Sequence, residues 1–251
     1  MASRDDSLRP HADHDPRPAH ALLTQNLLLA SLPETDAARL APHLELVHLG
    51  RHGLLFRARE PVRSVHFPLT AVISLIARLE SGEALEVGLV GSDGIGEAAV
   101  LPGIASMSCD GEVLISGTAL KISADVLKEM MHASESLCCA IARCTQLVLI
   151  RSMHVSVCNV FHSVEQRSIR WLLSVHDLSR QPDLPLTQEL LATMLGVRRP
   201  TMTVVLGSLR KAGLVAEERG HIRLINRAGL ERACCECYRV MCDNRVRLRE
   251  H

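Results

Sequence analysis

Short apolar runs alternate with turn residues between about Leu44 and Ile122. Two short helical patterns precede them, at residues 22–29 and 34–43. Several short strands at near-regular spacing are typical of an antiparallel sandwich or barrel. We therefore predict a β-rich domain over residues 21–132. The apolar runs that carry this prediction are Val65–Phe67, Val72–Ile76, Leu85–Val90, Val113–Ile115 and Ala119–Ile122.

The hydrophobic period changes after Ser123, which is a good N-cap for a short helix at Ala124–His132. Residues 135–161 then contain neither Pro nor Gly, and apolar side chains recur at spacings of four, three, four, seven and three. This pattern predicts one helix about 40 Å long, which we place within residues 133–162. Its apolar seam consists of Leu137, Ile141, Cys144, Val148, Val155 and Cys158.

A helix of this length either crosses its own domain or pairs with a second copy of the chain. The seam is close to a coiled-coil repeat with one polar interruption, at Arg151. We therefore predict that the seam forms the interface of a homodimer.

The pattern of residues 163–251 predicts several shorter helices and a hairpin. Ser163 can cap a helix at Val164–Leu178, and Thr187 can cap another at Gln188–Leu195. The inward-facing residues of the helix after Ser163 are expected to be Trp171, Leu172 and Val175.

A tight turn and a further helix follow. Gly196 can take the left-handed conformation that ends a helix, and Pro200 suits the first turn of the next one. Gly213 ends this helix, and residues 214–225 read as a hairpin. Helix, turn, helix and hairpin form the winged helix-turn-helix arrangement. The buried stripe of its second helix is predicted to be Met202, Val205, Leu206 and Leu209.

In this arrangement the N-terminal residues of the second helix reach base edges in the major groove of DNA. Arg198 and Arg199 stand there, and arginine can donate two hydrogen bonds to one guanine. Alone, an arginine pair at a helix start is more often a solvated surface feature. Its place between a capped helix and a hairpin favours DNA contact. We predict such contacts from Thr187, Arg198, Arg199, Pro200, Thr201, Thr203, Ser208 and Arg210, and from the wing residues Arg219, His221 and Arg223.

Charge is distributed unevenly along the chain. Residues 163–251 hold 15 basic and 10 acidic side chains, giving +5, whereas residues 1–162 hold 13 and 18, giving −5. A basic half suggests a polyanionic partner. Aromatic residues make up only 2% of the chain, which argues against binding single strands by base stacking.

Three segments of the basic half, Thr187–Ala192, Leu195–Thr201 and Leu209–Leu214, resemble the DNA-binding domain of the Crp–Fnr regulators. The resemblance implies an α+β fold with an N-terminal antiparallel β-roll or barrel as sensor domain, a long dimerisation helix and a C-terminal winged helix-turn-helix. It also implies a transcription regulator that binds palindromic double-stranded DNA as a homodimer. RNA polymerase is then a candidate partner.

Within this resemblance, Arg199 matches the arginine that typically contacts guanine in the family. Pro200 stands where the family often has a base-reading glutamate, and Val204 where it often has a further arginine. The family's sequence preference therefore does not carry over to this chain.

The candidate effector pocket departs from the family members that bind cyclic nucleotides. In those members a Gly-Glu pair is followed ten residues later by an arginine, which neutralises the cyclic phosphate, and a small residue. Here Gly96 and Glu97 are followed by Met107 and Ser108. Burying a phosphate without a cation is expensive, so we predict that cyclic AMP does not bind. Backbone N–H groups near residues 94–98 leave anion binding open as an alternative.

The cysteines do not predict a cofactor. No cysteine precedes Cys109, which excludes the N-terminal iron–sulfur cluster of the Fnr branch. Structural zinc sites usually pair two Cys-x2-Cys or Cys/His knuckles, and a second knuckle is missing beside the C-terminal group. We predict buried thiols and no metal, and leave a redox or metal-responsive role as the alternative. The C-terminal group consists of Cys234, Cys235, Cys237 and Cys242; haem ligation would fall to His132, His154 or His162, none of which is singled out.

Residues 1–20 have no sustained hydrophobic pattern and are predicted to be a disordered tail without a secretory signal. The apolar runs are shorter than the roughly 20 residues of a membrane helix. We therefore expect a cytoplasmic protein with reduced cysteines and no membrane partner.

No paired carboxylates, nucleophile elbow, Walker loop or His-Glu-x-x-His motif appears. We therefore predict that the chain is not an enzyme. A ligand-binding module, or a winged helix that contacts protein instead of DNA, remains the alternative. Salt dependence separates these, because binding through several phosphates weakens steeply with salt.

Overall fold

The computed structural model describes residues 19–97 and 106–247. The predicted tail, residues 1–20, lies almost wholly outside the described residues. The chain enters the fold through short helices. Asn26 caps the N-terminal end of the second helix, because its side chain accepts hydrogen bonds from the N–H groups of Leu28 and Leu29. These helices are α1 (Ala19–Leu23), α2 (Leu27–Ala30), α3 (Glu34–Leu40) and the 3-10 turn η1 (Ala41–His43).

The strands that follow pair into two antiparallel sheets within the described part of residues 45–123, with orders β1-β7-β3 and β2-β6-β4-β5. The five predicted apolar runs are all strands, and two further strands precede them. Apolar side chains between the sheets, among them Phe67, Ile73 and Leu120, form the first core of the molecule. The strands are β1 (Glu45–Leu49), β2 (Leu54–Phe56), β3 (Ser64–Pro68), β4 (Val72–Arg78), β5 (Ala84–Val90), β6 (Asp110–Ile115) and β7 (Gly117–Ser123).

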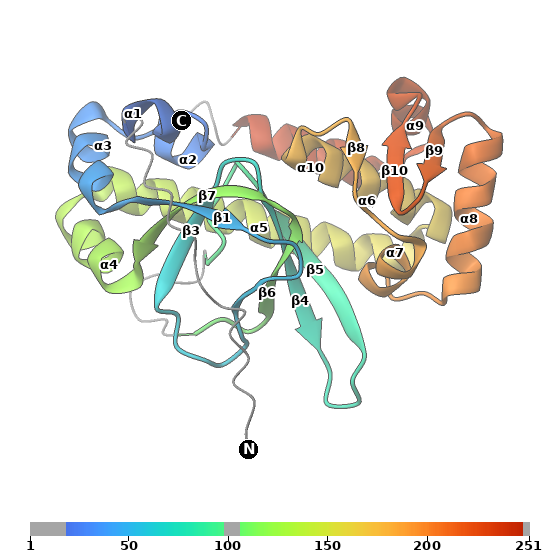
Figure 1. Ribbon diagram of the computed structural model, residues 1–251, viewed down its shortest axis with the longest axis horizontal. Helices are drawn as coiled ribbons and strands as arrows, with labels where there is room; N and C mark the ends of the chain where they lie inside the picture. Colours follow the sequence, from blue (N-terminus) through green and yellow to red (C-terminus); the bar gives the residue numbers. More distant parts are fainter. Residues whose placement is uncertain (1–18, 98–105, 248–251) are drawn as a thin grey trace, which may run out of the picture.

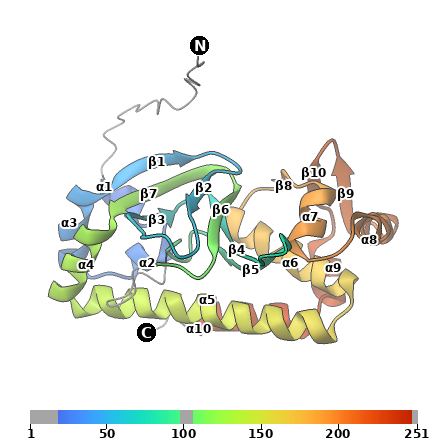
Figure 2. The ribbon, with the colours of Figure 1, turned by 90° about the horizontal axis from the view of Figure 1, so that it is seen from below.

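Helix α5 (Glu135–Phe161) is the longest element and follows the short helix α4 (Ala124–Ala133). It runs along one side of the molecule from α4 to the C-terminal helices (Figure 2). Ser134 caps it by accepting a hydrogen bond from the Leu137 N–H. Its length and mean hydropathy would also allow a membrane crossing. However, its Arg151 is nearly buried against Asp93 of the sheet domain, as in the core helix of a folded domain.

The predicted seam of α5 faces the chain's own interior, so its assignment as a dimer interface is wrong. Leu137, Ile141 and Cys144 belong to the core under the sheets, and Val148 is half-buried against it. Val155 and Cys158 are buried as well. Helix α5 is apolar on more than one side, and the predicted spacing picked out the stripe that faces the core. A different stripe remains exposed, which consists of Leu149, Met153, Val157, Val160 and Phe161.

The C-terminal part begins with α6 (Val164–Ser179), for which Ser163 and Gln166 form a capping box. Trp171, Leu172 and Val175 are buried as predicted. The later elements form a compact group beside the sheets, with α8 at the outer end of the molecule (Figure 1). They are β8 (Asp183–Leu184), α7 (Gln188–Met194), α8 (Arg199–Lys211), β9 (Val215–Glu218), β10 (His221–Leu224), α9 (Arg227–Ala233) and α10 (Glu236–Arg247).

One continuous core joins the C-terminal part to the sheet domain. Val72, Ile76 and Leu89 of β4 and β5 pack in the same cluster as Trp171 and Leu172 of α6. The last helix, α10, packs along α5 and places its Arg245 3.0 Å from the buried Asp93 carboxylate. Burial would raise the pKa of Asp93, but Arg151 and Arg245 outweigh it and hold that pKa below its usual value. The two parts of the chain are therefore docked through both apolar and charged contacts.

Candidate nucleic-acid interface

Helices α7 and α8 meet at a tight turn, as the sequence predicted. The Leu190 N–H donates to Thr187 Oγ1 at 3.2 Å and caps α7. Gly196 ends the helix with a φ of +62°, which glycine adopts without strain. Helix α8 then begins at Arg199 with Pro200 in its first turn and with no side-chain cap. Pro200 has no N–H, and the Thr201 N–H donates to the Arg198 carbonyl at 3.0 Å, so the arginine side chains are the main donors at this end of α8.

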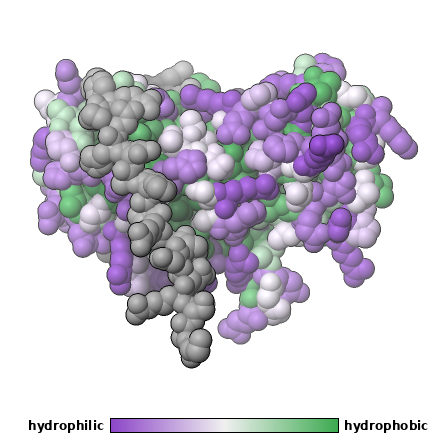
Figure 3. All heavy atoms as spheres, viewed as in Figure 1, coloured by the Kyte–Doolittle hydropathy of each residue, from purple (hydrophilic) through white to green (hydrophobic). Residues whose placement is uncertain are grey.

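One face of α8 is buried and the opposite face is open to solvent. The buried face consists of the four predicted residues, Met202, Val205, Leu206 and Leu209. The Arg199 side chain is 68% exposed, and polar side chains cover most of the surface at this end of the molecule (Figure 3). The exposed face consists of Arg198, Arg199, Pro200, Thr201, Thr203, Val204, Ser208, Arg210 and Lys211.

Several polar residues of this region interact with their own domain. Thr203 Oγ1 donates to Gln188 Oε1 at 2.7 Å, and Gln188 Nε2 donates to Glu217 at 2.8 Å. Thr203 thereby holds α8 against α7. Arg199 lies 3.4 Å from Glu189, in an exposed pair. Such a pair contributes little to stability, so the Arg199 guanidinium can exchange this partner for another acceptor.

The hairpin of β9 and β10 forms the predicted wing. Arg219 and Gly220 take φ values of +44° and +84° at its turn, and His221 follows with an exposed side chain. Arg223 differs from Arg219, because it donates to both carboxylate oxygens of Asp183 on β8, a strand that the sequence analysis did not predict. The hydrogen bond from Arg223 holds the pKa of Asp183 below its usual value.

The residues proposed for an effector pocket lie mostly inside the sheet domain. Glu97 is buried, and its Oε2 accepts a 2.7 Å hydrogen bond from the His66 N–H. Its Oε1 lies 2.8 Å from His66 Nδ1. Both carboxylate oxygens of Glu97 are therefore engaged by His66 in the interior of the sheet domain. Gly96 pairs with the same strand through a 2.8 Å hydrogen bond to the His66 carbonyl.

The other half of the proposed pocket is divided between core and surface. Met107 is buried in the core between the sheets, and Ser108 is exposed. Part of the segment between Glu97 and Met107 lies outside the described residues. Met107 thus fills space in the core at the position where a cyclic-nucleotide binder would place its arginine.

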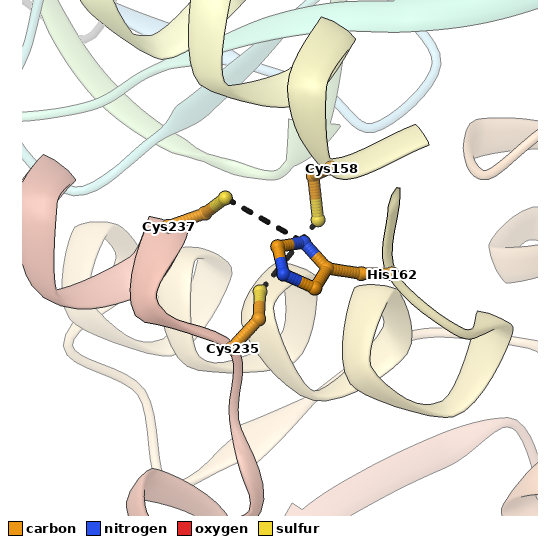
Figure 4. Close-up of side chains that lie close together, drawn as sticks. All are labelled: Cys158, His162, Cys235 and Cys237. Atoms are coloured by element: carbon orange, nitrogen blue, oxygen red, sulfur yellow. Dashed lines mark hydrogen bonds between the residues drawn. The ribbon is translucent and has the colours of Figure 1, made fainter. Parts of the chain in front are cut away.

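A second polar site, which the sequence analysis missed, lies at the far end of α5. Cys158 and His162 meet Cys235 and Cys237, and all four ligand atoms lie within 4.8 Å of one another. Figure 4 shows the three thiols surrounding the imidazole ring. The Cys158-x3-His162 spacing was a visible signal, because it is the knuckle that the C-terminal cysteines lacked. We name these four residues the Cys3His cluster.

The thiols of the Cys3His cluster are protected from water. Cys158 is 0% exposed, and Cys235 and Cys237 are nearly as deeply buried. Contact with the Cys235 thiol, together with burial, raises the pKa of Cys158 to about 12. Burial also raises the pKa of Cys237. In the absence of a metal these groups are protonated at neutral pH and poor nucleophiles.

Comparison with known proteins agrees with this geometry. Residues 166–233 match the Crp-like helix-turn-helix domain. The structure of FixK2 from Bradyrhizobium japonicum is similar, with a TM-score of 0.65 at 15% identity over 76% of this chain and 98% of that one. A putative Crp/Fnr-family regulator from Eubacterium rectale has a TM-score of 0.65 at 16% identity, over 84% of this chain and 98% of that one. The c-di-GMP responsive regulator CLP from Xanthomonas campestris has a TM-score of 0.61 at 20% identity, over 77% of this chain and 100% of that one. No curated protein sequence matches the chain.

The fold and the exposed helix α8 together define a protein with a C-terminal winged helix-turn-helix domain. The chain carries a Crp-like helix-turn-helix domain within the fold of the Crp–Fnr regulators. The predicted fold class and the resemblance seen in the sequence are both confirmed.

Proposed function

We propose that this chain is a cytoplasmic, homodimeric transcription regulator that binds DNA at specific sequences. The observation that carries the proposal is the N-terminal end of α8. Arg198 and Arg199 are exposed there, while the opposite face of the helix is buried in the core. A rigid helix with cationic donors at its N-terminal end suits the major groove.

Roles within this surface follow from position. Arg199 is the proposed base-reading residue, with Arg198 and Thr201 beside it, and Pro200 sets the helix start. Ser208 and Arg210 lie further along α8 and are the proposed contacts to phosphate. Arg219 and His221 would reach the backbone from the wing. Arg223 has a smaller role in this proposal, because Asp183 already occupies its guanidinium.

The proposed dimer uses the exposed stripe of α5 in place of the predicted seam. Met153 is 59% exposed and Val160 74% exposed, and members of the stripe recur three or four residues apart, so they share one helix face. Two such helices can pair as a coiled coil. A twofold dimer would place two copies of α8 on a palindromic operator, where RNA polymerase could be contacted.

We propose the division into residues 21–132 as sensor, 133–162 as dimerisation helix and 163–251 as DNA-binding domain. The sensor is proposed not to bind cyclic AMP. Support comes from Met107, which occupies the core, and from Glu97, whose carboxylate is engaged by His66. Calorimetry with cyclic AMP is expected to give no heat of binding, and a stoichiometric, tight isotherm would contradict this part.

Salt dependence of binding tests the function itself. A dimer that neutralises about six phosphates should lose about a thousandfold or more in affinity for a DNA duplex between 50 and 200 mM salt. The Arg210→Ala variant should reduce the slope of log K against log salt without changing sequence preference. A winged helix that contacts protein would give no DNA binding at low salt, and that result would remove the proposal.

A further inference from the structure

The Cys3His cluster lies outside the surface proposed for DNA. Its ligands come from two places far apart in the sequence: the C-terminal end of α5 with the residue after it, and the start of α10 with the link before it. The Sγ atoms of Cys158 and Cys235 are 3.7 Å apart, and Cys237 Sγ is 3.7 Å from His162 Nδ1. A tetrahedral zinc ion with Zn–S bonds of about 2.3 Å separates its ligands by about 3.8 Å.

We propose that Cys158, His162, Cys235 and Cys237 bind one Zn²⁺ ion. Three thiolates and one imidazole are a common ligand set of structural zinc, and four protein ligands leave no open position. Soft sulfur ligands select zinc over magnesium or calcium, which prefer oxygen. The buried position of the thiols agrees with a closed structural site, since a catalytic ion keeps a coordination position for water.

The surroundings of His162 orient it as a metal ligand. Its Nε2 lies 3.2 Å from the carboxylate of Glu236, and its Nδ1 faces Cys237. A carboxylate that accepts the proton of one ring nitrogen leaves the other as an unprotonated ligand, which is the usual arrangement around zinc-bound histidine. Glu236 lies between the ligands Cys235 and Cys237 in the sequence and therefore acts as a positioning residue.

The charge of the loaded site is also compensated. Three thiolates, a neutral imidazole and Zn²⁺ carry a net charge of −1, which is unfavourable in a buried place. The Arg170 side chain is buried, and its Nε donates to Cys158 Sγ at 3.3 Å. This hydrogen bond places a positive charge against the cluster and would stabilise the thiolate form.

Simple hydrophobic packing explains the cluster less well. Buried cysteines do behave as small apolar groups, but packing alone gives no reason for an imidazole, a guanidinium and three thiols to meet at one point. A Cys158–Cys235 disulfide is the other alternative. It would use two of the four ligands and leave His162 and Cys237 unexplained.

A metal ion at this place would join α5 to the C-terminal part of the chain. Cys158 and His162 flank the last turn of α5, immediately before α6 begins. The ion would therefore fix the direction in which the helix-turn-helix leaves α5. The inference concerns metal binding alone, so it stands or falls independently of DNA recognition.

Metal analysis of the full-length protein tests the proposal. Protein purified under reducing conditions, without added chelator, should contain about one zinc per chain. After removal of zinc, titration with Co²⁺ should produce the visible absorption of tetrahedral, thiolate-bound cobalt at one equivalent. Zinc should then displace this signal. The cobalt titration needs only the wild-type chain, so it remains decisive if a variant fails to fold.

Variants assign the ligands. Cys235→Ser and Cys237→Ser combined should lower the zinc content to less than about a fifth of an ion per chain. The matched control is Cys234→Ser, which removes the neighbouring thiol outside the cluster and should keep the full metal content. Glu236→Gln should weaken zinc affinity by about 10–100-fold while leaving the stoichiometry unchanged.

Three results would overturn the proposal. The first is a metal-free protein whose cobalt titration lacks the tetrahedral, thiolate-bound signal. The second is mass-spectrometric detection of a Cys158–Cys235 disulfide in protein isolated from reduced cells. The third is an iron–sulfur chromophore in place of zinc. Equal loss of zinc in Cys234→Ser and in the double variant would also contradict the assignment of ligands.

Discussion

At the scale of single residues, the exposed positions were predictable and their partners were not. The arginine pair and the proline at the start of α8 stand where the sequence placed them. Nothing in the sequence pattern indicated that Thr203 would donate a hydrogen bond to Gln188, or that Arg223 would donate one to Asp183. Cys158 and His162 form a visible knuckle, but their partners lie more than 70 positions away. Only folding brings such groups together.

Replacement of Arg199 tests the base-reading role at this scale. Arg199→Ala should cost about 1–3 kcal/mol per half-site and relax the preference at one base pair, because a bidentate contact to guanine is lost. The control is Arg232→Ala, an exposed arginine on α9. Binding of each variant to a selected site and to scrambled DNA at fixed salt is the measurement. Equal loss on both DNAs would reduce Arg199 to a backbone contact.

A second prediction concerns the buried Glu86. Burial raises its pKa to about 7, against the opposing effects of Trp171, Ser74 and Arg170. The folded state therefore holds a proton that the unfolded state releases near pH 4.5. Since the unfolded chain binds fewer protons in this window, stability should fall as pH rises from about 4.5 to 7, by at most about 3 kcal/mol.

Chemical denaturation at several pH values measures this effect. Glu86→Gln carries no charge at any pH, so its stability relative to wild type should increase between pH 5 and 8. The control Glu80→Gln alters an exposed carboxylate on the loop after β4 and should follow the wild-type curve. Parallel curves for Glu86→Gln and wild type would show that Glu86 does not titrate in this range.

At the scale of elements, the bounds of α5 were predicted and its orientation was not. Residues 135–161 contain neither Pro nor Gly, which allows a helix of this length. Apolar residues occur on more than one side of the helix, so period alone could not tell the core-facing stripe from the exposed one. The packing of the sheets and α10 decides between them, because it covers Leu137, Ile141 and Val155.

A charge in the exposed stripe tests the proposed dimer. Met153→Glu would place an unpaired carboxylate in an apolar interface, which should weaken dimerisation by about a hundredfold or more. Leu79→Glu is the control, since Leu79 is 65% exposed on the loop after β4, away from α5. Sedimentation should give a dimer for wild type and Leu79→Glu. A monomeric wild type at micromolar concentration would contradict the dimer.

At the scale of the whole molecule, the docking of the two parts could not be read from the sequence. Both sides of the shared core are made of ordinary apolar residues, such as Leu89 of β5 and Leu178 of α6. Each would be predicted to be buried, but neither indicates its partner. Gly91 lies close against α6: a Cβ there would lie 2.8 Å from the Leu178 Cβ.

Gly91→Ala should therefore separate β5 from α6 and destabilise the chain by about 1–3 kcal/mol. Gly50→Ala is the matched control, because a Cβ at Gly50 meets nothing within 4 Å, and its effect should stay within about 0.5 kcal/mol. Urea denaturation of both variants measures the difference. Equal stability of the two would mean that the β5–α6 contact is looser than the structure indicates.

Selection of DNA from a random pool by the purified full-length protein tests the central claim most directly. Two copies of α8 related by a twofold axis should enrich an inverted repeat whose half-sites lie about one helical turn, or 34 Å, apart. Sequencing of the bound fraction should recover that repeat from independent pools, and its binding should weaken steeply with salt. A pool that shows no enrichment, or a single asymmetric site bound by one chain, would contradict the account of a dimeric, sequence-specific regulator.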